Sequence, residues 1–181
     1  MKIAITGHTR GLGKTLLARL PDAVGFSRAE ISIDDTDALV SAVEPFDVFI
    51  NNACSGFSQT RVLLALFERW KYTDKTIVNI GSRSKYPNIS KGFEYSAAKA
   101  SLSHTSDSLR FLADRRCRII DINPGLMQSD LPSVTYSEVA DAVLWAINLP
   151  GHVEVGELSL WHKTPYAVVS RMKDAQKPPC E

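Results

Sequence analysis

The chain reads IAITGHTRGLG over residues 3–13, and this stretch decides how the rest of the sequence is interpreted. A short apolar run gives way to a glycine-rich turn, and helix-forming residues continue to about Leu20. Glycine lets the backbone pass close to a ligand or take a positive φ, and free N–H groups at a helix N-terminus favour a phosphate. The stretch therefore predicts a strand, a phosphate-binding turn and a helix, with a dinucleotide as the expected ligand.

A nucleoside-triphosphate loop is the alternative reading of Gly13-Lys14-Thr15. That motif requires a glycine five residues before Gly13, where this chain has His8. No strand-end aspartate suited to magnesium is evident either. The spacing TGxxxGxG instead favours a dinucleotide turn, which is a variant of the Rossmann fingerprint.

Size and composition are those of one globular domain. The 181 residues are 44% hydrophobic and 23% charged, with a net charge of +1, so nothing indicates a nucleic-acid partner. No apolar run approaches the roughly 20 residues that span a bilayer, and the N-terminus lacks a signal-peptide profile. The three cysteines, Cys54, Cys117 and Cys180, are odd in number and widely spaced. We expect a cytoplasmic protein without membrane contact, disulfide or metal site.

Strands and helices alternate strictly along the chain. Continuous apolar strands between helices predict a doubly wound α/β fold, with a parallel sheet covered on both faces. We expect a domain over residues 1–163 and a C-terminal tail, 164–181, with room for one short helix and no assigned role. The predicted strands are 3–5, 23–26, 30–33, 47–50, 76–80, 118–122 and 154–161, and the later helices are 36–43, 58–72, 95–114 and 137–148.

Tyr95 and Lys99 carry the chemistry predicted for this chain. Their i, i+4 spacing places both side chains on one helix face. A nearby ammonium favours phenolate, which would lower the tyrosine pKa from about 10 toward neutral and suit acid–base catalysis. A surface Tyr/Lys pair is the alternative. Ser82 argues against it, because it follows the strand 76–80 at the strand's carboxyl end, where this fold binds ligands.

Together the glycine turn and these three residues resemble the short-chain dehydrogenase/reductase family over residues 1–163. The resemblance implies a Rossmann-type sheet of about seven strands, ordered 3-2-1-4-5-6-7. It also implies hydride transfer between a nicotinamide cofactor and a small carbonyl or alcohol. In that reaction Tyr95 exchanges a proton with the substrate oxygen, Ser82 orients that oxygen, and Lys99 binds the nicotinamide ribose and lowers the pKa of Tyr95.

Further segments resemble the family's cofactor contacts. Residues 51–54, NNAC, correspond to NNAG with Cys54 replacing glycine, and residues 124–129, PGLMQS, correspond to PGxxxT with Ser129 replacing threonine. Asp34 matches an aspartate that recognises adenine. The resemblance thus assigns cofactor binding to Gly7, Thr9, Arg10, Gly11, Leu12, Gly13, Arg28, Asp34, Asn52, Ala53, Tyr95, Lys99, Pro124, Gly125, Met127 and Ser129.

Cofactor choice is predicted to favour NADP(H) over NAD(H). An NAD enzyme of this fold usually has an acidic residue after the second strand, whereas this chain has Ser27-Arg28 there and Arg10 in the glycine turn. Both arginines can reach a 2′-phosphate. A register shift would instead bring Glu30 to the ribose diol.

Two features depart from the family. Its catalytic asparagine has no counterpart in residues 55–75, so a water or Asn52 would replace it, or turnover would be slow. The helical lid that the family inserts after Ser129 is reduced to residues 130–136, which predicts an open site. The side chains expected to line that site are Tyr86, Phe93, Met127 and Tyr136.

A homodimer is expected through the helices 58–72 and 95–114. The stripe of Leu63, Phe67 and Trp70 is expected to exceed what one sheet face can cover, and most members of the family that the chain resembles pair through these helices. A non-catalytic NADP(H)-binding sensor or interaction module is the competing function. Such a module would need the glycine turn but not the set of Ser82, Tyr95 and Lys99.

Overall fold

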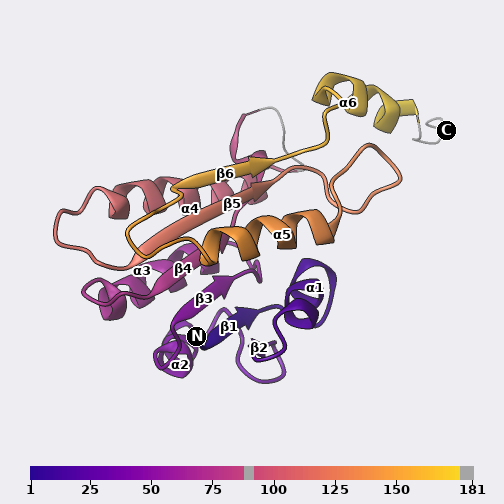
Figure 1. Cartoon of the computed structure of the whole chain (residues 1–181). Coiled ribbons are helices and arrows are strands. Elements are labelled where there is room, and N and C mark those ends of the chain that lie inside the picture. The colour runs from indigo at the N-terminus through magenta and orange to yellow at the C-terminus, as the bar shows by residue number, and fades with distance from the viewer. Residues whose placement is uncertain (88–91, 176–181) are drawn as a thin grey trace.

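One parallel sheet organises the chain in the computed structural model, which describes residues 1–87 and 92–175 (Figure 1). Its strand order is β2-β1-β3-β4-β5-β6, and every neighbouring pair is parallel. The strands are β1 (Ile3–Thr6), β2 (Val24–Phe26), β3 (Val48–Asn51), β4 (Thr76–Ile80), β5 (Arg118–Pro124) and β6 (Glu157–Leu160). The helices are α1 (Gly11–Arg19), α2 (Thr36–Val43), α3 (Ser58–Trp70), α4 (Phe93–Arg110), α5 (Tyr136–Ile147), α6 (Tyr166–Ala175) and a 3-10 turn, η1 (Arg83–Lys85).

The doubly wound α/β class is confirmed, but the strand count is not. Within the described residues the sheet has six strands, because residues 30–33 do not form the predicted edge strand. The backbone turns after β2 instead: the N–H groups of Glu30 and Ile31 both donate to the Ser27 carbonyl, at 3.1 and 2.9 Å. The order is the predicted one without that strand.

Helices cover both faces of the sheet, and successive strand residues point to opposite layers. In β5, Ile120 belongs to the core cluster that includes residues of α1 and α5, whereas Ile119 belongs to the cluster that includes residues of α2, α3 and α4. Both side chains are fully buried. This arrangement explains why the central strands are continuously apolar.

The apolar stripe of α3 belongs to the core of a single chain. Leu63, Phe67 and Trp70 are at most 1% exposed, whereas Leu64 on the outer side is 46% exposed. The inference of a dimer from an oversized stripe is therefore wrong, because the sheet and α2 cover it completely. The dimer itself stays a prediction.

The chain's last described helix, α6, follows β6 and lies beyond the carboxyl ends of the strands (Figure 1). Val169 anchors it and is 7% exposed. Cys54 and Cys117 are free thiols, and Cys180 lies outside the described residues. None of the helices in the described part of the chain is both long and apolar enough to cross a bilayer.

Candidate functional site

The glycine turn between β1 and α1 is closed so tightly that side chains are excluded from it. Gly7 and Gly11 have positive φ, at 71° and 54°. A Cβ added to Gly13 would lie 2.2 Å from the Gly7 carbonyl oxygen and 2.7 Å from the Asn52 amide nitrogen. The N-terminus of α1 thus lies beside a turn of bare backbone, which fits the pyrophosphate of a dinucleotide.

Asn52, after β3, holds this turn in place. Its Nδ2 donates to the carbonyl oxygens of Thr6, at 2.9 Å, and Gly7, at 3.3 Å. The hydroxyl of Thr6 accepts from the backbone N–H groups of Asn52 and Ala53, both at 3.0 Å. Asn52 does not replace the family's catalytic asparagine, because its amide is directed to the turn.

The residues predicted to bind the adenosine half of the cofactor lie in the glycine turn and in the segment that follows β2. Arg10 and Arg28 are exposed, and their guanidinium groups make no hydrogen bond or ion pair within residues 1–87 and 92–175. Glu30 folds back, and its carboxylate accepts from the Ser27 N–H at 2.8 Å. Asp34 accepts from the hydroxyls of Ser58 and Ser55; the Ser58 bond is the main reason that the pKa of Asp34 is lowered, and Arg28 adds to the effect.

Ser82 and Tyr95 meet at the carboxyl end of β4. Ser82 is 8% exposed and caps η1, its hydroxyl accepting from the Ser84 N–H at 3.0 Å. Tyr95 lies in the first turn of α4. Burial raises the pKa of the Tyr95 phenol, and a hydrogen bond with Ser82 opposes part of that rise. The expected lowering of the Tyr95 pKa by Lys99 is therefore wrong for this structure.

The Lys99 ammonium does not contact the Tyr95 hydroxyl, which explains why it does not lower the Tyr95 pKa. Its side chain is 3% exposed, and Nζ donates to Oε1 of Gln59 at 2.6 Å and to the Ile80 carbonyl at 2.8 Å. The ammonium lies 5.6 Å from the centre of the Tyr95 ring rather than bonded to its oxygen. Burial also lowers the pKa of Lys99 itself.

Gln59, in the first turn of α3, is the site residue that the sequence analysis missed. Its Oε1 accepts from Lys99, and its Nε2 donates to the carbonyl oxygens of Asn51, at 2.7 Å, and Ile80, at 3.2 Å. The side chain is 3% exposed. The sequence did contain a signal for this residue: Gln59 lies close to the position where the family has its catalytic asparagine.

A buried polar row supports Gln59 across the sheet. Asn51, Asn79 and Asp121 are neighbours in register on β3, β4 and β5. Asn51 donates to Asn79, and Asn79 donates to Asp121, each at 3.0 Å. Asp121 also lies 3.1 Å from the Arg110 guanidinium, yet burial outweighs that charge and raises the pKa of the Asp121 carboxyl. Buried polar groups linked in this way fix one geometry.

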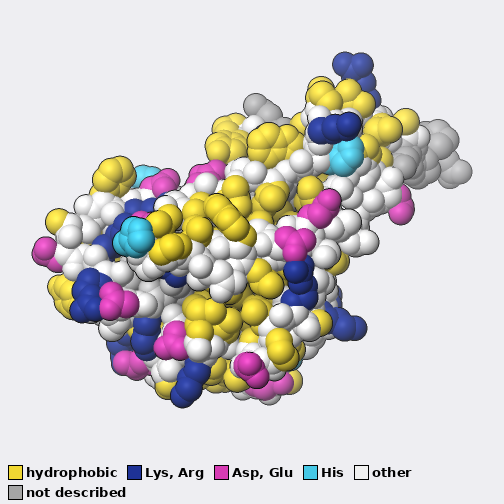
Figure 2. Space-filling model, viewed as in Figure 1, with side chains coloured by type: hydrophobic (Ala, Val, Ile, Leu, Met, Phe, Trp, Pro, Cys, Tyr) yellow, Lys and Arg dark blue, Asp and Glu magenta, His cyan; other side chains and the backbone are white. Residues whose placement is uncertain are grey.

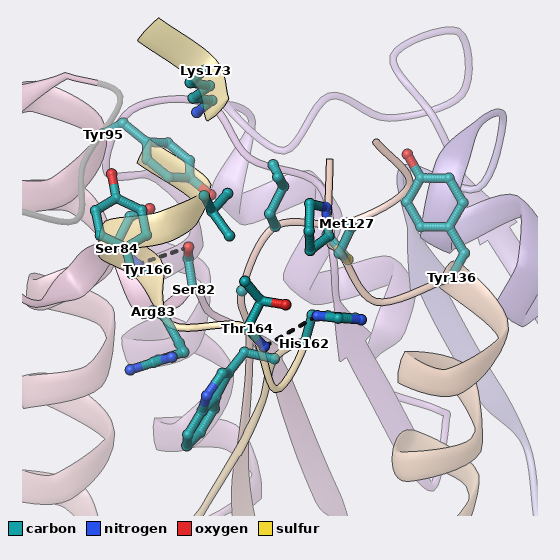
Figure 3. A pocket seen from close by; sticks show the side chains of 15 residues that line it. Ser82, Arg83, Ser84, Tyr95, Met127, Tyr136, His162, Thr164, Tyr166 and Lys173 are labelled. Carbon is teal, nitrogen blue, oxygen red and sulfur yellow. Dashed lines mark hydrogen bonds between the residues drawn. The ribbon is translucent and has the colours of Figure 1, made fainter. Parts of the chain in front are cut away.

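A cavity of about 520 Å³ opens beside Ser82 and Tyr95 (Figure 3). Met127 and Tyr136 line it as predicted, with Gly125 and Leu126 from the loop after β5. Tyr86 and Phe93 do not belong to its lining: the Tyr86 hydroxyl donates to Glu157 at 3.4 Å, and Phe93 is 97% exposed. Its remaining lining residues are Arg83, Ser84, Pro132, Trp161, His162, Thr164, Tyr166, Val169 and Lys173.

Helix α6 covers this cavity, which corrects two expectations. The tail had no assigned role, yet it supplies Tyr166, Val169 and Lys173 to the lining. The shortened segment 130–136 therefore does not leave the site without cover. Figure 2 shows the hydrophobic side chains of α6 alongside basic ones at this end of the molecule.

The segment after β5 is only partly directed to the cavity. The Gly125 N–H donates to the Leu160 carbonyl at 2.7 Å, which fixes the start of the loop. Ser129 is exposed and outside the lining; its hydroxyl accepts from the Leu131 N–H at 3.3 Å. Tyr136 lines the cavity and also reaches the glycine turn, since a Cβ at Gly11 would lie 3.4 Å from its hydroxyl.

No known family profile matches the chain, but individual proteins do. An uncharacterized oxidoreductase of Staphylococcus saprophyticus is 30% identical over 94 residues, which cover 46% of this chain and 40% of the relative. An uncharacterized oxidoreductase of Staphylococcus aureus is 26% identical over 151 residues, covering 75% and 65%. The chain thus spans less than two thirds of the length of either relative.

Solved structures extend the likeness over nearly the whole chain. Serine dehydrogenase from Escherichia coli superposes with a TM-score of 0.76 at 19% identity, covering 91% of this chain and 99% of that one. A short chain dehydrogenase from Burkholderia cenocepacia in complex with NADP gives 0.73 at 21% identity, covering 96% and 93%. The chain has the short-chain dehydrogenase/reductase fold. The fold that the sequence resemblance implied is thereby confirmed.

The short-chain dehydrogenase/reductase fold also occurs with the other nicotinamide cofactor. A 3-alpha-hydroxysteroid dehydrogenase from Pseudomonas sp. B-0831, complexed with NADH, gives a TM-score of 0.71 at 17% identity, covering 88% of this chain and 95% of that one. The fold alone therefore does not distinguish NADP from NAD.

Proposed function

We propose that this protein is an NADP-dependent oxidoreductase that transfers a hydride between the nicotinamide cofactor and a small carbonyl or alcohol. The observation that carries the proposal is that Ser82 and Tyr95 line one cavity of about 520 Å³, with the ammonium of buried Lys99 lying 5.6 Å from the centre of the Tyr95 ring. The names of the curated relatives and the dehydrogenases among the solved structures support it. The chain matches only part of those curated relatives, so its oxidoreductase activity is itself proposed here.

The bare backbone of the glycine turn would bind the pyrophosphate, and Lys99 would reach the nicotinamide ribose. Arg10 and Arg28 would contact a 2′-phosphate, for which their lack of partners within the described residues leaves them available. A charge-assisted hydrogen bond contributes about 1.5–3 kcal/mol, or roughly ten- to a hundredfold in affinity.

When bound, the nicotinamide ring supplies or accepts the hydride. Tyr95 gives its proton to the substrate oxygen during reduction, while Ser82 donates a second hydrogen bond to that oxygen. Two pre-placed donors stabilise the alkoxide that develops there. Because the pKa of Tyr95 is raised, the phenol is protonated near neutral pH and ready to act as an acid. This favours carbonyl reduction as the neutral-pH direction.

Gln59 would act as a positioning residue, in place of the family's asparagine. It bonds Lys99 directly, and its own amide is fixed by the carbonyl oxygens of Asn51 and Ile80. Lys99 is thereby held at a fixed depth beneath the Tyr95 ring. This arrangement supports an ordered site without the missing asparagine.

An assay of NADPH oxidation over a panel of small aldehydes and ketones tests the proposal. Carbonyl-dependent oxidation is expected. The competing sensor function predicts tight NADPH binding in calorimetry and no oxidation with any member of the panel.

A homodimer through α3 and α4, and a cytoplasmic location, remain predictions. The exposed apolar side chains Leu64 on α3 and Phe93 on α4 offer a contact surface, at 46% and 97% exposure. Light scattering at micromolar concentration checks the assembly, and a monomeric mass would contradict it.

A further inference from the structure

The ionisable side chains in the wall of the cavity beside Tyr95, other than Tyr95 and the two further tyrosines, are basic. They are Arg83, His162 and Lys173, and no aspartate or glutamate among the described residues lines the cavity. Most other lining side chains are apolar or aromatic. Positive charge without a compensating acid in a largely apolar pocket favours an anionic ligand.

Two of the three basic side chains have protein partners. The Arg83 guanidinium stacks on the Trp161 ring, 3.8 Å from its centre. His162 accepts from the Thr164 N–H through Nδ1, at 3.2 Å, which leaves Nε2 as the protonated nitrogen of the neutral ring. Stacking leaves the Arg83 N–H groups as donors, but Figure 3 shows the Arg83 guanidinium on the side of the cavity away from Lys173.

Lys173 is different. Its side chain makes no hydrogen bond, ion pair or cation–π contact with any side chain or backbone group that the structure describes. By contrast, Lys85, the last residue of η1, forms an ion pair with Glu157 and donates a hydrogen bond to Ser103. The Lys173 ammonium is therefore available to a ligand.

The geometry of α6 aims Lys173 at the cavity. Val169 precedes it by four residues, so both lie on one helix face, and Val169 is buried against the cavity wall. Figure 3 shows Lys173 above the cavity, on the side away from Thr164 and His162, with Ser82 below it. A substrate held by Ser82 and Tyr95 would extend toward α6.

We propose that Lys173 binds a carboxylate of the substrate, which makes the substrate class an oxo acid and its hydroxy acid. This inference rests on the proposed function. A single free ammonium and a wall of apolar side chains suit a carboxylate, whereas a phosphate dianion usually takes several donors. In the reaction the carbonyl carbon gains a hydride from NADPH and its oxygen gains the Tyr95 proton, while the carboxylate stays unchanged.

Binding to the protein saturated with NADP⁺ tests this subsite without turnover, because cofactor and ketone are then both oxidised. The probes are acetoacetate and its neutral methyl ester, measured by calorimetry. The wild-type protein is expected to bind acetoacetate at least about tenfold more tightly than the ester. Lys173→Met should remove that difference and leave the affinity for the ester unchanged.

Arg171→Met is the matched control. Arg171 lies on the same helix, is exposed and does not line the cavity, so its loss removes the same charge without touching the subsite. Acetoacetate affinity should stay at the wild-type value in this variant. Equal losses in the two variants, equal wild-type affinity for acid and ester, or no binding of either probe would each overturn the inference.

Turnover separates this inference from the function on which it rests. Oxidation of NADPH with neutral carbonyls, together with Lys173-independent binding of acetoacetate, would leave the oxidoreductase standing and remove the subsite. Lys173-dependent binding of acetoacetate without turnover of any carbonyl would support the subsite and defeat the oxidoreductase.

Discussion

Two regions at the carboxyl ends of the strands, the glycine turn and the cavity, are built in different ways. The turn end, Gly7–Gly13 with Asn52, is formed by backbone and by bonds from two strand ends. The pocket end is assembled from the side chains of η1, α3, α4, the loop after β5, and α6. The turn end depends on the absence of side chains, whereas the pocket end depends on where long side chains are held. Substitutions should therefore fail differently at the two ends.

The largest effect is expected at Gly13. In Gly13→Ala the new methyl would meet the Gly7 carbonyl oxygen, so the turn must open. Overpacking of this kind costs about 1–3 kcal/mol of folding free energy, and NADPH affinity should fall by more than about a hundredfold. Thermal unfolding and calorimetry measure the two losses. Gly151→Ala is the control, because a Cβ there meets nothing within 4 Å; similar results for both variants would contradict a closed turn.

At the pocket end, Gln59→Leu should keep the fold and damage the chemistry. It removes the side-chain acceptor of the buried Lys99 ammonium, which keeps only the Ile80 carbonyl, and takes the Gln59 donor from the Asn51 carbonyl. We expect kcat to fall by about ten- to a hundredfold, because an unsatisfied buried charge moves or loses its proton. Steady-state kinetics with a circular dichroism check measure this.

Two variants on α3 make the Gln59 result interpretable. Arg61→Leu changes an exposed residue two positions after Gln59 on α3 and should keep the wild-type kcat. Gln59→Glu restores an acceptor for Lys99 and should recover part of the rate. A Gln59→Leu enzyme with full kcat would remove Gln59 from the account.

The pH dependence should show the protonation state of Tyr95. Burial raises the pKa of this phenol above its usual value of about 10. Below its pKa the acid form is nearly complete, so carbonyl reduction should vary little between about pH 6 and 9. Alcohol oxidation needs the phenolate, whose fraction rises about tenfold per pH unit, and its rate should rise accordingly. An oxidation rate that levels off near pH 7 would show a lowered pKa instead.

The smallest effect concerns cofactor choice at the turn end. Arg28→Ala should reduce the NADPH/NADH affinity ratio by about tenfold, at the low end of one charge-assisted contact. Glu30→Gln is the paired variant: it should leave NADH affinity unchanged, since the Glu30 carboxylate is bonded to Ser27. If Arg28→Ala keeps the NADPH/NADH affinity ratio and Glu30→Gln weakens NADH binding, Glu30 and not Arg28 selects the cofactor.

The sequence predicted the turn end better than the pocket end, for a physical reason. Gly7, Gly11 and Gly13 are close in sequence, so their spacing alone specifies the turn. Ser82 and Tyr95 could be brought together because parallel strands end at one edge. Residues 30–33 alternate like a strand, but the local bonds of Ser27 form a turn that periodicity does not reveal.

Long-range packing decided what the sequence analysis missed. The Gln59–Lys99 bond depends on how α3 lies against α4, and the Tyr95 pKa depends on burial and on where the ammonium points. The role of α6 depends on its position over the cavity. The sequence did not reveal this position, because α6 is far from Ser82 along the chain. None of these has a signature at short spacing.

The central claim is that Tyr95 is a proton donor in an active oxidoreductase, and Tyr95→Phe tests it most directly. The change removes one oxygen and keeps the ring over Lys99, so NADPH affinity should stay within about twofold of wild type. Carbonyl-dependent NADPH oxidation should fall by about 10²- to 10⁴-fold, the usual contribution of general acid catalysis. Calorimetry and single-turnover kinetics on the same preparation give both numbers. A Tyr95→Phe protein that oxidises NADPH at the wild-type rate, or a wild-type protein that binds NADPH but reduces no carbonyl, would contradict the account.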